Sequence, residues 1–246
     1  MLIDLNYIVS KFSLKINNIA HVGVNNAFEV DTYKKINPKS KIFLVEPQSD
    51  IFEKLQKKFI NDEQVEVLNY SLGNKTGVEK LHLSNTHKGS ASLLLPTLHK
   101  KIHPEVKFKG FEYVSIEKFD NLKLENVNFI NIDTQGYELN VLRGASKSLK
   151  NIDYIIIEIN TVPLYKDSAL IHDIDEYLYM KGFIRQITVF WDSDCYWGDA
   201  FYIKKSSLSK MKIFKINIKN YLIKSKILYN SIHKYKKLFN KIKNFI

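Results

Sequence analysis

The stretch that decides the fold is residues 129–145, which read FINIDTQGYELNVLRGA. An apolar run, 129–132, ends at the acid Asp133, and a polar turn with Gly136 follows. From Glu138 the apolar residues recur at the spacing of an amphipathic helix. This order predicts a strand that delivers a carboxylate to the edge of a sheet. At such edges, open α/β sheets bind their ligands.

Short apolar strands alternate with helical patterns through most of the chain, which predicts an α/β domain with a parallel sheet. Strands are expected near 19–23, 41–46, 65–69, 127–132 and 153–159. Helices are expected near 27–36, 51–59, 138–149 and 170–181. A closing antiparallel hairpin, 183–190 with 199–203, completes a domain that we place at residues 1–205.

Residues 74–116 interrupt this alternation. Residues 78–83 are expected to form a strand, and 85–110 a long loop with three histidines and two prolines. A loop of this length inside a compact domain is more often functional than not, so we expect a lid or a substrate wall. The histidines, His87, His99 and His103, suggest a metal, but a solvated loop is the favoured interpretation.

Two features earlier in the chain are typical of a nucleotide cofactor site. Gly23 follows the first strand and allows a tight turn into a helix whose free N–H groups suit an anion. Glu46 ends the second strand about 20 residues on, where such folds place a carboxylate on ribose hydroxyls. An ordinary turn and an exposed charge are the structural alternatives. The pair does not separate nicotinamide cofactors from S-adenosylmethionine, because both contain a ribose.

Three segments of this chain resemble the FkbM-type methyltransferases, which use S-adenosylmethionine and mostly methylate oxygen. They are 45–55 (VEPQSDIFEKL), 90–94 (SASLL) and 132–138 (IDTQGYE), and the resemblance extends from about residue 19 to 204. It implies a Rossmann-like, seven-stranded class I methyltransferase sheet. It also implies S-adenosylmethionine as the cofactor.

The resemblance also implies positions for the cofactor. Gly23 and Asn25 would lie near its methionine part, Glu46 on its ribose, and the turn that ends at Ser71 beside its adenine. Two positions depart from the family pattern. The first motif has His21 where an acid is usual, and Ala27 where a second glycine is usual. His21 is kept among the candidate cofactor-binding residues.

Asp133 and Glu158 are the candidate catalytic residues, because they lie near the ends of adjacent predicted strands. Either could take the proton of a hydroxyl acceptor, and Asp133 is also a candidate for contact with the cofactor. With Asn160 they could instead hold Mg²⁺, but a base without metal is favoured. Glu158 could alternatively be a hydrogen-bonded part of the wall. The candidate acceptor residues are Ser92, Gln135 and Tyr165, and Glu138 is expected to be a helix cap.

The charge of the chain is divided unevenly. Residues 204–246 carry 13 lysines and no acid, whereas the rest of the chain is close to neutral. From Leu228 to Ile246 apolar residues recur at spacings of three and four, which predicts a basic amphipathic helix in an extension, 206–246. It could pack on the body or on a second subunit as a homo-oligomer contact, or lie on an anionic membrane. Nucleic acid is the least favoured partner.

No apolar run is long enough for a membrane span, and the first residues do not resemble a signal peptide. With the single cysteine, Cys195, these features favour a cytoplasmic protein, free or peripheral at the inner membrane surface. The leading hypothesis is an O-methyltransferase acting on a sugar, glycan or other polar metabolite. One alternative is a catalytically weakened relative that acts as a membrane or scaffold component. The other is a nicotinamide-dependent oxidoreductase.

Overall fold

The computed structural model describes residues 1–84, 88–191 and 193–208. Residues 1–204 form one compact unit. The basic amphipathic helix that the sequence predicts between Leu228 and Ile246 lies outside the described residues. Among those that are described, no helix has both the length and the apolar character needed to cross a bilayer.

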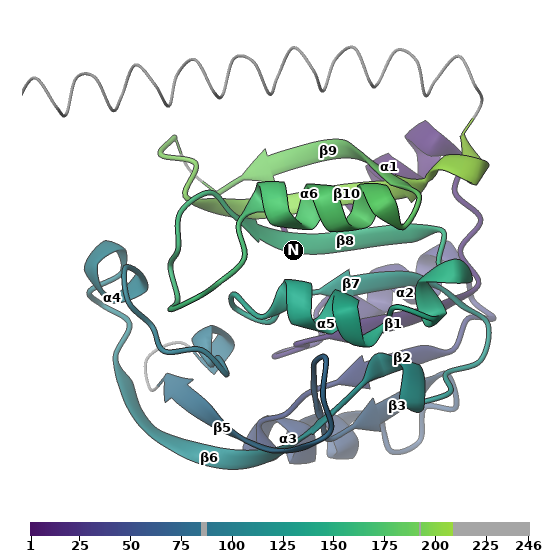
Figure 1. Cartoon of the computed structure of the whole chain (residues 1–246). Helices are drawn as coiled ribbons and strands as arrows, with labels where there is room; N and C mark the ends of the chain where they lie inside the picture. Colours follow the sequence, from purple (N-terminus) through teal and green to yellow (C-terminus); the bar gives the residue numbers. More distant parts are fainter. Residues whose placement is uncertain (85–87, 192, 209–246) are drawn as a thin grey trace, which may run out of the picture. The chain divides into compact units, whose positions relative to one another are not determined.

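A seven-stranded sheet forms the centre of this unit (Figure 1). Its strand order is β3-β2-β1-β7-β8-β10-β9. The strand β10 runs in the opposite direction to the other six, so its pairs with β8 and β9 are antiparallel and all other pairs are parallel. The strands are β1 (Asn18–Val22), β2 (Ile42–Val45), β3 (Val65–Leu68), β7 (Val127–Ile132), β8 (Tyr154–Asn160), β9 (Phe183–Phe190) and β10 (Trp197–Lys204). The predicted Rossmann-like sheet with a closing hairpin is confirmed. Every residue of β2, β7 and β8 is buried, as expected for strands covered on both faces.

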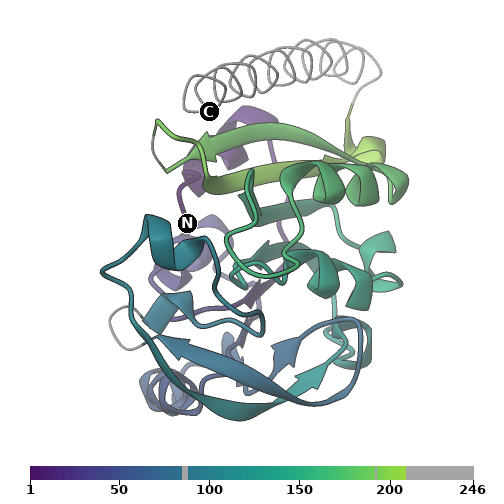
Figure 2. The same cartoon turned by 60° about the vertical axis from the view of Figure 1, so that its left-hand side comes forward.

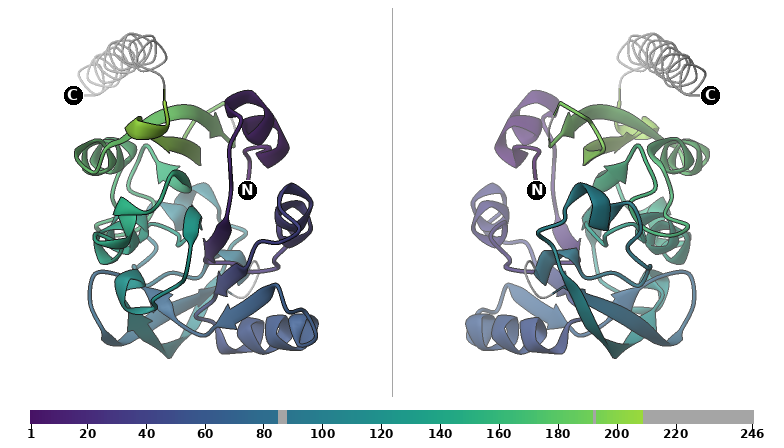
Figure 3. Two further views of the ribbon diagram at one scale, coloured as in Figure 1. Left: turned by 90° about the vertical axis from the view of Figure 1, so that its right-hand side faces the viewer. Right: turned by 90° about the vertical axis from the view of Figure 1, so that its left-hand side faces the viewer.

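Helices cover both faces of the sheet (Figure 3). On one face lie α1 (Leu5–Phe12), α2 (Val30–Ile36) and α3 (Ser49–Phe59), and on the other α5 (Glu138–Gly144) and α6 (Ile171–Met180). Each helix buries an apolar side, for example Ile51 and Leu55 of α3. Single turns of 3₁₀ helix occur at Lys88–Ser90 (η1), Phe119–Asn121 (η2), Ser148–Lys150 (η3) and Lys205–Ser207 (η4).

Helix boundaries differ from the sequence prediction at three places. The helix α2 begins three residues later than expected, because Asn25 and Ala27 adopt φ of 51° and 54° in the turn before it. The helix α5 ends at Gly144, where a Cβ would lie 1.8 Å from the carbonyl oxygen of Gly73. The helix α1 was not predicted; the side chain of Asp4 caps it by accepting the backbone N–H groups of its first turn.

A second, three-stranded sheet occupies most of the excursion between β3 and β7 (Figure 2). It consists of β4 (Ser71–Leu72), β5 (Gly77–Ser84) and β6 (Phe108–Glu117), in the order β4-β6-β5. The strand β5 was expected and β6 was not. The segment that joins them contains η1 and α4 (His99–Ile102). The loop predicted for 85–110 is therefore shorter and more structured than expected.

Candidate active site

A cleft opens at the carboxyl ends of β1, β2 and β7. The second sheet and the segment 89–93 form its opposite wall. The structure brings seven of the candidate residues into this lining: Gly23, Asn25, Glu46, Ser71, Ser92, Asp133 and Gln135. His21, Glu158 and Tyr165 lie outside it.

Glu46 lies at the end of β2 and is held mainly by backbone donors. Its Oε2 accepts the backbone N–H of Asn25 at 3.0 Å, and its Oε1 accepts that of Gln48 at 2.9 Å. The side chain is only 2% exposed. Burial raises the pKa of this carboxyl, and the backbone N–H groups oppose the increase because they favour the ionised form. Glu46 therefore has a fixed orientation in the cleft.

The fold itself requires a glycine at position 23, which is a reason besides the approach to a ligand that the sequence suggests. Its φ is +80°, and a Cβ at this position would lie 1.7 Å from the carbonyl oxygen of Asp133. Its backbone N–H is bonded to Val45 O at 2.9 Å, and Asp133 N–H to Val22 O at 2.9 Å. The glycine thus permits the ends of β1 and β7 to meet. The expected close approach is an approach to Asp133 within the fold.

Gln135 connects the acids of the candidate catalytic pair. Its Nε2 donates to Asp133 Oδ1 at 2.8 Å and to Glu158 Oε2 at 2.9 Å. Its Oε1 accepts the hydroxyl of Tyr165 at 2.8 Å. The structure therefore places Asp133 and Glu158 side by side, at the ends of adjacent strands.

The acids of this cluster favour different protonation states. Burial raises the pKa of Glu158 well above its usual value, and the charges of Asp133 and Glu138 raise it further. The hydrogen bond between Glu158 and Asp133 acts in the same direction and favours the protonated form of Glu158. Of the two candidates, Asp133 is therefore the group better suited to accept a proton.

Glu138 is fully buried at the first residue of α5. Its Oε1 accepts the backbone N–H groups of Thr134 at 2.9 Å and Gly136 at 3.0 Å. This contact holds the turn between β7 and α5. The expected helix cap is wrong, because both donors precede the helix and α5 has no side-chain cap. Burial raises its pKa to about 7, with Asp133 contributing in the same direction.

The expected acceptor residues occupy two layers. Ser92 lines the cleft, and its hydroxyl donates to the carbonyl oxygen of Gln135 at 2.7 Å. Tyr165 is 1% exposed and does not line the cleft, so its hydroxyl acts through Gln135. The segment before α4 is fastened to this region, because Thr97 and His99 donate backbone N–H groups to Leu164 O at 3.1 and 3.0 Å. Residues 97–99 of the excursion are therefore held against the segment that carries Tyr165.

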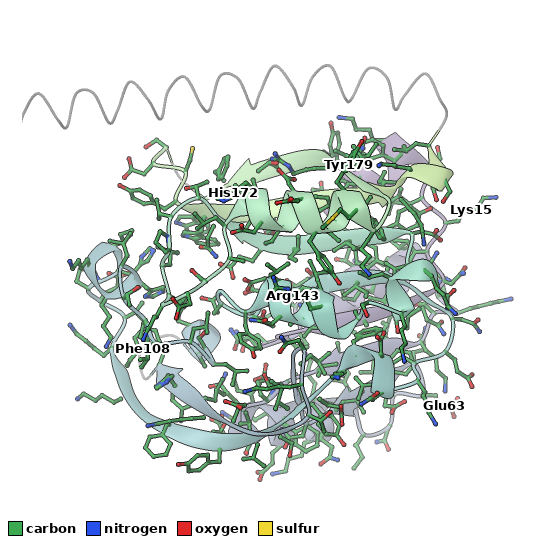
Figure 4. All side chains as sticks on the ribbon, in the orientation of Figure 1. Lys15, Glu63, Phe108, Arg143, His172 and Tyr179 are labelled. Atoms are coloured by element: carbon green, nitrogen blue, oxygen red, sulfur yellow. The ribbon has the colours of Figure 1, made fainter. Side chains whose placement is uncertain are left out.

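The solvated loop expected for the histidines is wrong for His99. This side chain is buried, and its ring lies 5.4 Å from that of Phe108 and 5.2 Å from that of Tyr165 (Figure 4 labels Phe108). Burial, together with His103, lowers the pKa of His99 to about 4, so it is neutral. His87 lies outside the described residues. Within the described ranges, no three His, Cys, Asp or Glu residues are grouped as metal ligands.

His21 lines a second cavity, and Gly23, Asn25, Gly89 and Asp133 line both this cavity and the cleft. The ring of His21 is buried, with Nδ1 3.3 Å from the Tyr33 hydroxyl and Nε2 3.2 Å from Asn131 Nδ2. Burial lowers its pKa, so the ring is neutral. This cavity is also lined by three residues that were not predicted as site residues, Glu29, Asn131 and Asp199. In the sequence, Asp199 is distinguished only by its position directly before an apolar strand segment.

Comparison with known proteins covers most of the chain. Residues 19–185 match the family model described as the methyltransferase FkbM domain. The 2-O-methyltransferase NoeI of Sinorhizobium fredii is 22% identical over 158 residues, which are 60% of this chain and 65% of that protein. The chain thus spans just under two thirds of the length of this curated relative.

Solved structures of methyltransferases are also similar. Methyltransferase FkbM from Methylobacillus flagellatus KT has 13% identity and a TM-score of 0.49, covering 76% of this chain and 43% of its own. A SAM-dependent methyltransferase from Aquifex aeolicus has 16% identity and a TM-score of 0.45, covering 82% and 90%. Because the FkbM domain model matches more than half of its residues, the chain belongs to the FkbM methyltransferase family.

Proposed function

We propose that this protein is an S-adenosylmethionine-dependent O-methyltransferase that acts on a hydroxyl of a sugar, a glycan or another polar metabolite. The observation that carries the proposal is the pairing of two carboxylates in one cleft. Glu46 is oriented by backbone donors, and Asp133 belongs to a network of titratable side chains. Membership of the FkbM family supports methyl transfer. The similarity to a protein named as a 2-O-methyltransferase supports an oxygen acceptor.

The residues on the β2 side fit the nucleoside part of this cofactor. A carboxylate offers about four lone-pair sites, and the backbone N–H groups of Asn25 and Gln48 use only part of this capacity. Gln48 Nε2 also lies 3.4 Å from Glu46 Oε1. We expect the ribose hydroxyls to use the acceptor capacity that remains. Tyr70, Ser71 and Leu72 line the same cleft and supply apolar surface and two hydroxyls for an adenine ring.

The residues on the β7 side fit the work that methyl transfer requires of a protein. S-adenosylmethionine supplies an already activated methyl group. The protein must align the acceptor, which can contribute about 7–11 kcal/mol, and remove its proton. Asp133 is placed to accept that proton at Oδ2, because Gln135 Nε2 occupies Oδ1. Gln135 donates to both Asp133 and Glu158, and this shared bond holds Asp133 in position.

The first experiment is calorimetry with S-adenosylmethionine, its demethylated product S-adenosylhomocysteine, and NAD. We expect the first two to bind and NAD not to bind. S-adenosylhomocysteine at 100 times its Kd should raise the free energy of unfolding by about 2.7 kcal/mol. Binding of NAD alone would refute the proposal in favour of an oxidoreductase.

The second experiment tests the reaction. S-adenosylmethionine with a radiolabelled methyl group is incubated with the protein and a panel of oligosaccharides, and the labelled products are tested for O-methyl ethers. Transfer to a hydroxyl supports the proposal. Tight cofactor binding without transfer to any member of a broad panel would favour the catalytically weakened alternative, for which His21 is the motivation.

A further inference from the structure

The cavity beside His21 has an unusual distribution of charge. Its lining includes three carboxyl groups, from Glu29, Asp133 and Asp199, and contains no Lys or Arg side chain from the described residues. It joins the cleft at Gly23, Asn25 and Asp133, which line both spaces. A ligand whose ribose lies on Glu46 could therefore extend past Asn25 into an acidic space. Such a space favours a cationic group.

Asp199 comes from β10, far along the chain from the first motif. The register of the sheet pairs it with Glu158, so both side chains lie on one face of adjacent strands. Asp199 is only 6% exposed, and its Oδ2 accepts the backbone N–H of Leu2. Its buried carboxyl has no cationic side chain as a hydrogen-bond or ion-pair partner among the described contacts. The remaining acceptor sites are available to a bound cation.

An ammonium group already lies in this cavity. The amino nitrogen of Met1 is 3.3 Å from Glu29 Oε1. Burial lowers the pKa of this amine, but Glu29, Asp199 and Asp133 outweigh that effect and raise the pKa above its ordinary value. The carboxyl groups of this cavity therefore stabilise the protonated form of a primary amine, whichever molecule carries that amine.

At the end of β1, His21 stands where an acid is usual, and it cannot supply the negative charge that would bind an ammonium group. Its ring is neutral, and both ring nitrogens face polar partners within the fold, Tyr33 and Asn131. A cofactor with an α-ammonium group needs a carboxylate from another element. Among the residues that line the second cavity, β10 provides one in Asp199 and the turn before α2 provides another in Glu29.

We infer that Asp199, assisted by Glu29, binds the α-ammonium group of the methionine part of S-adenosylmethionine in this second cavity. This inference rests on the proposed function. The cofactor ammonium takes the place that the Met1 amine occupies in the structure, so the first residues move aside on binding. Asp199 is a binding residue for the cofactor and takes no part in the transfer of the methyl group.

The test compares two ligands that differ only in the amino-acid part. S-adenosylhomocysteine carries an α-ammonium and an α-carboxylate group, whereas 5′-methylthioadenosine has the same adenine, ribose and thioether without either. Calorimetry with Asp199→Asn should show an affinity for S-adenosylhomocysteine that is roughly 10- to 100-fold weaker, as for loss of a charge-assisted hydrogen bond. The affinity for 5′-methylthioadenosine should remain within about twofold, because that ligand does not reach Asp199.

Two further variants make the result decisive. Glu29→Gln should also weaken the binding of S-adenosylhomocysteine more than that of 5′-methylthioadenosine, but by a smaller factor than Asp199→Asn. It serves as the second test if Asp199→Asn unfolds. Glu63→Gln, an exposed acid labelled in Figure 4, removes one charge elsewhere and should change neither affinity. Equal weakening of both ligands, or no change in either, would overturn the inference. A wild-type protein that binds neither ligand would refute the proposed function instead.

Discussion

The two carboxylates of the cleft, Glu46 and Asp133, are held in different ways. Glu46 is bonded mainly to backbone N–H groups, which do not titrate and keep their geometry at any pH. Asp133 is bonded to the side chain of Gln135, next to a buried Glu158 with a raised pKa. The first arrangement fixes a recognition group, and the second permits a proton to move. The difference supports the proposed division of the cleft into a cofactor end at Glu46 and a chemical end at Asp133.

The largest expected effect is that of Asp133→Asn. This variant keeps the shape of the side chain and removes the base, so methyl transfer should fall by roughly 10²–10⁴-fold. The affinity for S-adenosylhomocysteine should change far less. Single-turnover transfer and calorimetry measure the two quantities separately.

Glu158→Gln is the matched control for Asp133→Asn. Burial raises the pKa of Glu158 well above its usual value and favours its protonated form, so the amide should retain most of the transfer rate. If the two variants lost activity equally, Asp133 and Glu158 would act as one unit, and our assignment of the base to Asp133 would be incorrect.

Glu46→Gln tests the other carboxylate. Loss of the charge that receives the ribose hydroxyls should weaken binding by about 1–3 kcal/mol. Because both ligands contain the ribose, S-adenosylhomocysteine and 5′-methylthioadenosine should lose affinity equally, unlike in Asp199→Asn. Calorimetry that shows unchanged affinity for both would remove Glu46 from the cofactor site.

Tyr165→Phe tests the layer behind the cleft. The variant leaves Oε1 of the half-buried Gln135 without the hydroxyl that it accepts at 2.8 Å. We expect the free energy of unfolding to decrease by about 1–3 kcal/mol, measured by urea denaturation. Tyr113→Phe is the control, because Tyr113 is 70% exposed and its change should stay within about 0.5 kcal/mol. Equal stabilities for the two variants would show that Tyr165 does not support Gln135.

The smallest expected effect is a change in the pH dependence of stability in Glu138→Gln. The pKa of Glu138 is about 7 in the folded protein and about 4.5 when exposed. Between these values the folded state keeps a proton that the unfolded state releases, so stability falls as pH rises. The slope from this group is at most ~1.4 kcal/mol per pH unit. The Gln variant should lack this contribution, and identical slopes in urea denaturation from pH 4.5 to 7 would contradict it.

The strands of the main sheet were predictable because each carries a local signal. The buried strands are short apolar runs, and Glu46 and Asp133 follow such runs directly. The register of a parallel sheet then brings the carboxyl ends of β1, β2 and β7 to one edge. The strand β6 was harder to predict, because antiparallel pairing with β5 depends on partners outside its own sequence.

The sequence by itself determined the α/β class, the strands that carry Glu46, Asp133 and Glu158, and the FkbM family motif, because these depend on local pattern and spacing. Only the tertiary structure decided which of these groups touch. It placed Gln135 between two acids and buried His99. It also placed Asp199 and the neutral His21 in the lining of one cavity. These contacts join residues that are distant in the chain. Their pKa values follow from burial and neighbouring charge, which no local pattern contains.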